Sequence, residues 1–285
     1  MPGKVTRENL PNNQLWYYLI SEAREFWPPR PRKVSYGLVR PEPSMAKPVA
    51  AESEAQRFLR EGSGPWADLA LTLPVFVGYH LGVVFLPVRN AADVVTRELT
   101  RLAENSIWQY IGLTLGIGAA FASVLLMLGR GHALRVSRFV FVGIEGIVYA
   151  IAMRLAGQYV VTQLALIGGV PDGRFSALVM SLGAGFYEEI AFRVVLFGLG
   201  LRLILGLIGS LPRLKRALIA LAWAITVAFV FSGWHYVGDL GEPFELRSFV
   251  FRTVCGLAFT VIYAFRGFAP AVWTHTIYDA WVLLF

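Results

Sequence analysis

Long apolar segments alternate with short polar connections from residue 66 to the carboxyl end of the sequence. Each has a length near the roughly 20 residues with which an α-helix crosses a bilayer. They are residues 66–88, 106–128, 139–156, 175–201, 218–236, 248–265 and 268–285. The pattern predicts an all-α, polytopic membrane protein with about seven transmembrane helices. Polar residues within these spans are expected to meet in a cavity inside the membrane.

Residues 1–64 have a different character, with six prolines between positions 28 and 48 and many charged side chains. Such a composition disfavours a packed core. The stretch QLWYYLISEAREFW, residues 14–27, either lies as a helix on the membrane surface or belongs to a disordered tail. We therefore expect a largely flexible extension over 1–64 and a transmembrane domain over 65–285.

Composition supports the membrane assignment and narrows the partners. The 285 residues are 56% hydrophobic and 16% charged, and the mean hydropathy is +0.55. The net charge of +7 does not indicate nucleic acid, because Lys and Arg concentrate in the extension and in the connections between spans. The single cysteine, Cys255, excludes an intrachain disulfide and a cysteine metal cluster.

The distribution of basic residues predicts an orientation. If the amino terminus is cytoplasmic, 11 Lys and Arg flank the spans on the inner side and 5 on the outer side. Basic residues favour the cytoplasmic side of a membrane protein. We expect a multi-pass protein of a bacterial inner membrane with a cytoplasmic amino terminus, and the lipid bilayer is its first partner.

Three ionisable residues interrupt the fourth span, in the stretch FYEEIAFRVVLF. Ionisable groups inside a membrane are costly and mark functional sites. Glu189 and Arg193 are four residues apart, so they share a helical face and are expected to form an ion pair. Glu188 points about 100° away. It is expected to be unpaired and suited to act as a general acid or base.

Two further spans carry histidines. His235 ends the fifth span in FVFSGWHYVGDL, and it is either an interfacial residue of an aromatic belt or a site residue. His275 and Asp279 lie four apart in AVWTHTIYDAW and share a helical face. Together the three spans could supply a cavity with carboxylates and imidazoles, which is an inventory for activating water and stabilising an oxyanion.

The ordered set of motifs resembles the CPBP family of intramembrane proteases, which includes the CAAX prenyl endopeptidases and Abi-type proteins. EEIAFR is similar to the family's Glu-Glu-x-x-x-Arg motif, FSGWH to Phe-x-x-x-His, and HTIYD to His-x-x-x-Asn/Asp. The resemblance covers roughly residues 175–285. It implies an intramembrane endopeptidase whose substrate is a membrane-associated protein or peptide.

The resemblance also implies a role for each motif residue. Glu188 would activate the attacking water and His235 would help to hold it, while Glu189 and Arg193 would support the site. His275 and Asp279 would bind the oxyanion. An ionised Asp cannot donate a hydrogen bond to an oxyanion, so Asp279 must either be protonated or orient His275.

No cofactor is expected. Two histidines and a glutamate could ligate zinc, but the helix motif His-Glu-x-x-His is absent and the resemblance implies hydrolysis without metal. Four other polar residues within or near spans are not expected to be catalytic, namely Glu145, Arg154, Arg252 and His80. Arg252 is expected either to snorkel or to approach the carboxylates of the site, and His80 to be a packing or hydrogen-bonded residue. Glu145 and Arg154 are nine residues apart and are not expected to pair. The alternatives to a protease are a non-catalytic scaffold, regulator or immunity factor of the same fold, and a proton-coupled transporter.

Overall fold

The computed structural model describes residues 65–86, 89–104, 106–128, 135–161, 173–238 and 241–284. All of them belong to one compact unit, Glu52–Phe285. Every regular element within these ranges is a helix. The predicted extension over 1–64, including its interfacial stretch, lies outside the described residues.

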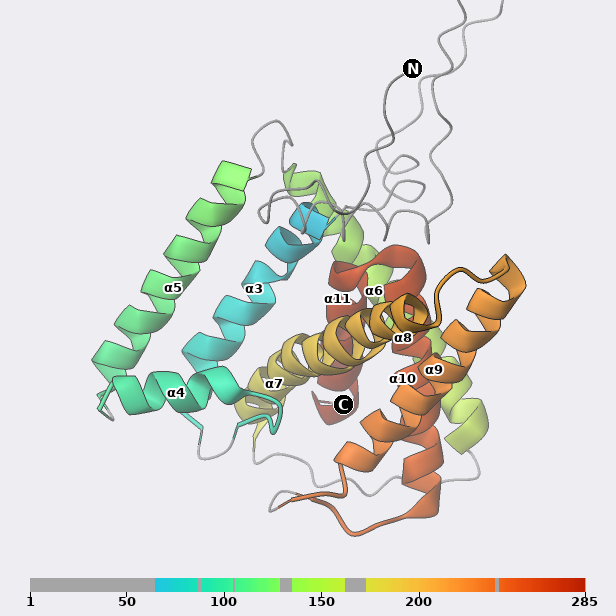
Figure 1. The fold of residues 1–285 in the computed structure, drawn as a ribbon. Helices are drawn as coiled ribbons and strands as arrows, with labels where there is room; N and C mark the ends of the chain where they lie inside the picture. Colours follow the sequence, from blue (N-terminus) through green and yellow to red (C-terminus); the bar gives the residue numbers. More distant parts are fainter. Residues whose placement is uncertain are drawn as a thin grey trace, which may run out of the picture. The chain divides into compact units, whose positions relative to one another are not determined.

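Helices occupy all seven predicted spans (Figure 1). Six of them are long and apolar enough to cross a membrane, and the fourth runs without a break from Arg174 to Ile208. The seventh, α11, has 17 residues. The elements are α3 (Pro65–Val83), α5 (Ile107–Leu128), α6 (Val136–Val161), α7 (Arg174–Gly183), η2 (Ala184–Leu199), α8 (Gly200–Ile208), α9 (Arg213–Trp234), α10 (Leu246–Arg266) and α11 (Phe268–Leu284). The prediction of a polytopic helical membrane protein is confirmed.

The outward faces of these helices are apolar. On α6 the exposed side chains Val140, Ile144, Val148 and Leu155 recur at helical spacing. Water would not tolerate so many exposed aliphatic groups on one protein, but lipid chains do. The apolar residues that predicted spanning helices therefore lie on the outer surface, where lipid would contact them.

A short helix, α4 (Val94–Leu102), was not predicted. Asp93 caps it, because the Oδ1 oxygen accepts a hydrogen bond from the main-chain N–H of Thr96 at 2.8 Å. Leu99 is buried, whereas Arg101 is exposed and pairs with Glu98. The helix packs against α5 and crosses one end of it (Figure 1). Its nine residues are too few to give a membrane-length apolar signal.

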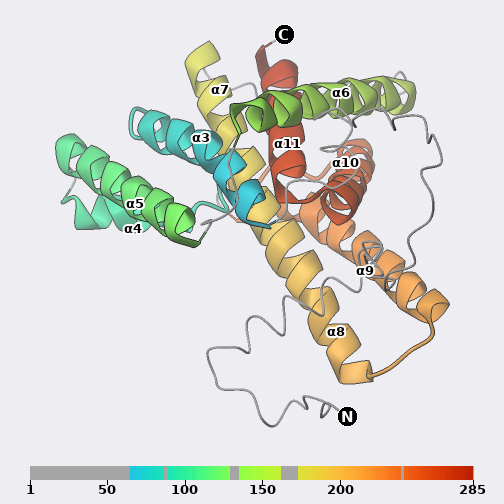
Figure 2. The ribbon, with the colours of Figure 1, turned by 90° about the horizontal axis from the view of Figure 1, so that it is seen from above.

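Helix α11 lies in the interior of the bundle, where it contacts α3, α6, α7, η2 and α10 (Figure 2). It can be surrounded in this way because residues 269–276, apart from Trp273, are all buried. Gly185 of η2 allows the closest approach. A methyl group at this position would clash with the hydroxyl of Thr276 and lie 2.9 Å from the main-chain oxygen of Val272. Because Gly185 has no side chain, η2 and its acidic residues can pack close to α11.

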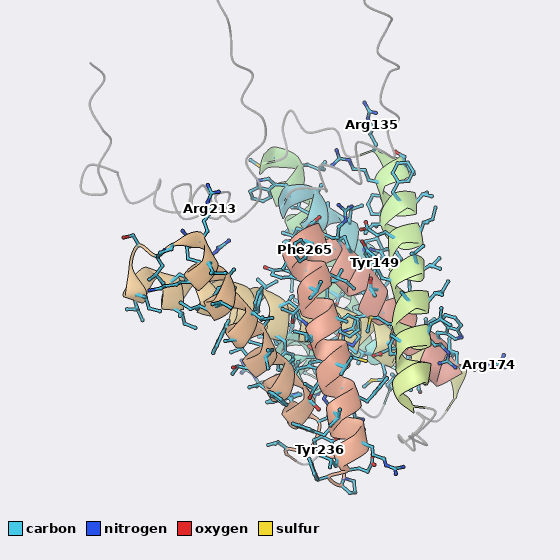
Figure 3. All side chains as sticks on the ribbon, turned by 90° about the vertical axis from the view of Figure 1, so that its right-hand side faces the viewer. Arg135, Tyr149, Arg174, Arg213, Tyr236 and Phe265 are labelled. Atoms are coloured by element: carbon cyan, nitrogen blue, oxygen red, sulfur yellow. The ribbon has the colours of Figure 1, made fainter. Side chains whose placement is uncertain are left out.

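Basic residues that the sequence assigned to the same side of the membrane lie at the same end of the bundle. Figure 3 shows Arg135 and Arg213 toward one end of the bundle, and Arg174 and Tyr236 toward the other. The sequence assigned Arg135 and Arg213 to the inner side and Arg174 to the outer side. The end that faces the cytoplasm remains a prediction.

Candidate active site

The acidic and basic residues of η2 are buried in the bundle. This element is a π-helix of 16 residues, whereas π-helical geometry is usually limited to single turns near functional sites. Glu189 and Arg193 have no exposed surface, and the Arg193 Nη1 atom lies 3.2 Å from Glu189 Oε1. Arg193 Nη2 also donates to the main-chain oxygen of Gly256 on α10 at 3.2 Å. The predicted ion pair is present.

Glu189 has a second partner that the sequence did not reveal. Its Oε1 atom lies 2.7 Å from Nδ1 of His275 on α11. The Nε2 atom of the same imidazole faces Asp279 Oδ2 at 3.4 Å. Both ring nitrogens of His275 thus point at carboxylates, and the ring of Phe259 stacks on the imidazole with centroids 4.3 Å apart. These contacts fix the orientation of His275.

Phe231 of α9 connects the three motifs. Its ring lies 4.4 Å below the guanidinium of Arg193, and its centroid lies 6.1 Å from that of His275 and 5.2 Å from that of His235. Gly256 makes room for Phe231, because an added methyl group would lie 2.8 Å from the phenyl ring. Residues far apart in the sequence therefore gather around one aromatic side chain.

His235 follows the last residue of α9 and is half-buried. Its Nδ1 atom lies 3.0 Å from the main-chain oxygen of Phe231. A carbonyl only accepts, so this contact places a hydrogen on Nδ1 and leaves Nε2 as an acceptor in the neutral ring. Within the described part of the chain, no direct hydrogen bond joins His235 to Glu188.

Glu188 is not unpaired, which corrects the prediction. Its Oε1 atom accepts a hydrogen bond of 2.8 Å from Nδ2 of Asn90, a buried residue in the connection between α3 and α4. The reason is tertiary: this connection folds back into the bundle beside η2. The sequence offered no signal for Asn90, because a single Asn in a short connection belongs to none of the motifs.

A second polar cluster lies next to Glu188. Tyr187 contacts Nε2 of His80 through its hydroxyl, and Tyr110 lies 3.1 Å from Nδ1 of the same ring. His80 has no exposed surface. It is a hydrogen-bonded interior residue, as the sequence analysis expected.

The other ionisable residues also have structural partners. Glu145 pairs with Arg266 of α10, while Arg154 lies 5.1 Å over the ring of Trp281. Arg252 binds Glu242 at 2.7 Å. As predicted, Glu145 and Arg154 do not pair with each other.

No group of three His, Cys, Asp or Glu side chains suited to a metal ion occurs among the described residues. The expectation that the chain uses neither zinc nor another cofactor stays a prediction.

Comparison with known proteins identifies the region that contains these residues. Residues 171–281 match the family model described as "Type II CAAX prenyl endopeptidase Rce1-like". Residues 171–281 form an Rce1-like domain. The CPBP resemblance is thereby confirmed, and the chain carries a domain of a protease family. The Rce1-like domain includes all seven residues of the three motifs but not Asn90. No curated protein and no solved structure matches the chain.

Proposed function

We propose that the protein is an intramembrane endopeptidase that hydrolyses a peptide bond in a membrane-associated protein or peptide. Glu188 activates the attacking water, His235 helps to hold it, and His275 with Asp279 binds the oxyanion. Glu189 and Arg193 hold His275 in place and balance the charge of the site. No metal takes part.

The difference between the two adjacent glutamates carries the proposal. Glu189 is fully buried, and its Oε1 atom is occupied by His275 and Arg193. Glu188 retains an exposed fraction of 7%, and only its Oε1 atom accepts a hydrogen bond from the described residues. The Oε2 atom of Glu188 is therefore available to water. A carboxylate with one fixed and one available oxygen suits general base catalysis.

His235 supplies a second contact for the water. Because its Nδ1 atom faces the main-chain oxygen of Phe231, the acceptor of the neutral ring is Nε2. This nitrogen accepts one hydrogen of the water while Glu188 accepts the other. In this proposal a water bridges the two side chains, between which the described residues form no direct hydrogen bond.

The oxyanion is assigned to His275. Nδ1 is engaged by Glu189 at 2.7 Å, but the contact between Nε2 and Asp279 is longer, at 3.4 Å. Asp279 is also the more exposed partner, with 28% of its side chain accessible. Because the contact with Asp279 is long, the N–H at Nε2 can also donate to a developing oxyanion beside Asp279 while the ring keeps its orientation.

Each step of the reaction conserves its atoms. Glu188 removes a proton from water, and the hydroxide attacks the carbonyl carbon of the scissile bond. The carbonyl oxygen becomes an oxyanion held by His275. When the carbon–nitrogen bond breaks, Glu188 returns its proton to the leaving amine. The products are a new carboxyl terminus and a new amino terminus.

The setting of the site supports a membrane-associated substrate. Its residues lie on helices whose outer surfaces are apolar, as on α6 with Val140 and Ile144 exposed. A soluble peptide would have to leave water to reach them, whereas a substrate already in the bilayer would not.

The experiment compares membranes from cells that produce the parent protein or a Glu188→Gln variant. Mass spectrometry of protein termini should find membrane proteins that accumulate uncleaved only with the variant. The control is Glu98→Gln, at an exposed position of α4, which should process them normally. If Glu188→Gln inserts normally and every terminus matches the parent, the protein acts instead as a scaffold or regulator.

A further inference from the structure

We propose that Asn90 is a positioning residue for Glu188, although it lies outside the Rce1-like domain. This inference rests on the proposed function of Glu188. Asn90 holds one carboxylate oxygen so that the other remains aimed at the water.

The amide of Asn90 is oriented by its own turn. Its Oδ1 atom accepts a hydrogen bond of 2.9 Å from the main-chain N–H of Ala92. An N–H group only donates, so this contact fixes which end of the amide is the oxygen. The Nδ2 end then faces Glu188 and donates to Oε1 at 2.8 Å. A flipped amide would lose both hydrogen bonds.

The main chain at Asn90 is also held. Its N–H donates to the hydroxyl of Tyr79 at 3.2 Å, and this hydroxyl donates to Asp93 Oδ2 at 2.8 Å. The other oxygen of Asp93 caps helix α4 through Thr96. Tyr79 is completely buried, and Asn90 and Asp93 are buried as well. The donor to Glu188 is thus built into a chain of hydrogen bonds from α3 to α4.

This support gives Glu188 what a general base needs. A glutamate side chain has three rotatable bonds, and catalysis requires one oxygen at a defined place. A hydrogen bond to an ionised carboxylate is stronger than one between neutral groups. By occupying Oε1, Asn90 holds the carboxylate in place and leaves Oε2 for the water.

Three variants test the proposal. Asn90→Ala removes both amide contacts. Asn90→Asp keeps an acceptor for Ala92, and so keeps the turn, but it replaces the donor by a carboxylate that repels Glu188. Tyr149→Phe is the control, because it removes a hydroxyl that donates to the Glu145 carboxylate at 2.8 Å and takes no part in the turn of Asn90.

The activity readout separates positioning from folding. Asn90→Ala should lower kcat by about 10- to 100-fold with KM unchanged, the loss expected for one hydrogen bond to a charged group. Asn90→Asp should be slower still. Tyr149→Phe should lower the melting temperature without a comparable loss of kcat. If kcat and melting temperature fall in proportion across all three variants, Asn90 is structural and the proposal is wrong.

Infrared spectroscopy provides a readout that does not depend on activity. The carboxylate stretching band that disappears in Glu188→Gln belongs to Glu188. This band should shift in Asn90→Ala and stay in place in Tyr149→Phe. A band unchanged in Asn90→Ala would overturn the proposal, even if Glu188→Gln is inactive. A shifted band together with an active Glu188→Gln variant would retain the contact and refute the proposed function.

Discussion

Replacement of Arg193 by Met should lower the free energy of unfolding more than replacement of any other buried charged side chain. Arg193 has no exposed surface, and its guanidinium contacts Glu189, the main-chain oxygen of Gly256 and the ring of Phe231. Met fills most of the volume but leaves Glu189 buried with His275 as its remaining partner. Removing one member of a buried ion pair costs about 3–5 kcal/mol.

The assay is equilibrium unfolding of the purified protein in mixed micelles, with the free energy of unfolding as the measured quantity. The double variant Arg193→Met with Glu189→Met should recover much of the loss, because no uncompensated carboxylate remains. Arg266→Met is the control for the loss of an arginine from an ion pair, since Arg266 binds Glu145 away from the motif residues. It should lower stability without slowing cleavage by the folded fraction.

The expected loss of stability is absent if Arg193→Met unfolds with the same free energy as the parent. The expected recovery is absent if the double variant is less stable than Arg193→Met alone. In either case the contact between Arg193 and Glu189 would not be what stabilises the buried carboxylate.

Three further predictions concern the same region. Gly185→Ala should destabilise the protein by about 1–3 kcal/mol and slow cleavage, because the main-chain atoms of α11 that face the added methyl group cannot move away easily. Gly116→Ala is the control, since no neighbouring residue lies within 4 Å of its added methyl group, and it should change neither quantity in the same unfolding and cleavage assays. The kcat of Asp279→Asn should be at least that of the parent, because the amide oxygen can still face His275 and the amide N–H₂ group can donate to the oxyanion. A loss of kcat as large as that of Glu188→Gln would contradict the role of Asp279 in aligning His275. Dialysis against a chelator should leave the cleavage rate unchanged, and restoration of a lost rate by added zinc would show that the site uses a metal.

The positions of the spans could be predicted from the sequence because length and hydropathy decide them. A segment of about 20 apolar residues has few alternatives to a spanning helix. The pairing of Glu189 with Arg193 could also be predicted, since it depends on spacing within one helix. It is formed even though η2 is wound as a π-helix.

Contacts between helices could not be predicted in the same way. The hydrogen bond from His275 to Glu189 depends on how η2 and α11 are rotated about their axes, which one sequence does not reveal. Motif order predicted that His275 belongs to the site, but not that it would bind Glu189. The prediction of an unpaired Glu188 failed for a related reason: its partner, Asn90, comes from a connection whose path is set by Tyr79 and Asp93.

One rate measurement tests whether Glu188 activates the water. The parent, Glu188→Gln and Glu98→Gln proteins are reconstituted in liposomes, and single-turnover cleavage of a substrate found in the terminus experiment is followed. Glu188→Gln keeps the shape of the side chain but cannot take up the proton of water. For Glu188→Gln we expect a rate at least about 100-fold below that of the parent, with the free energy of unfolding unchanged and Glu98→Gln fully active. Cleavage by folded Glu188→Gln at the parent rate would contradict this role of Glu188.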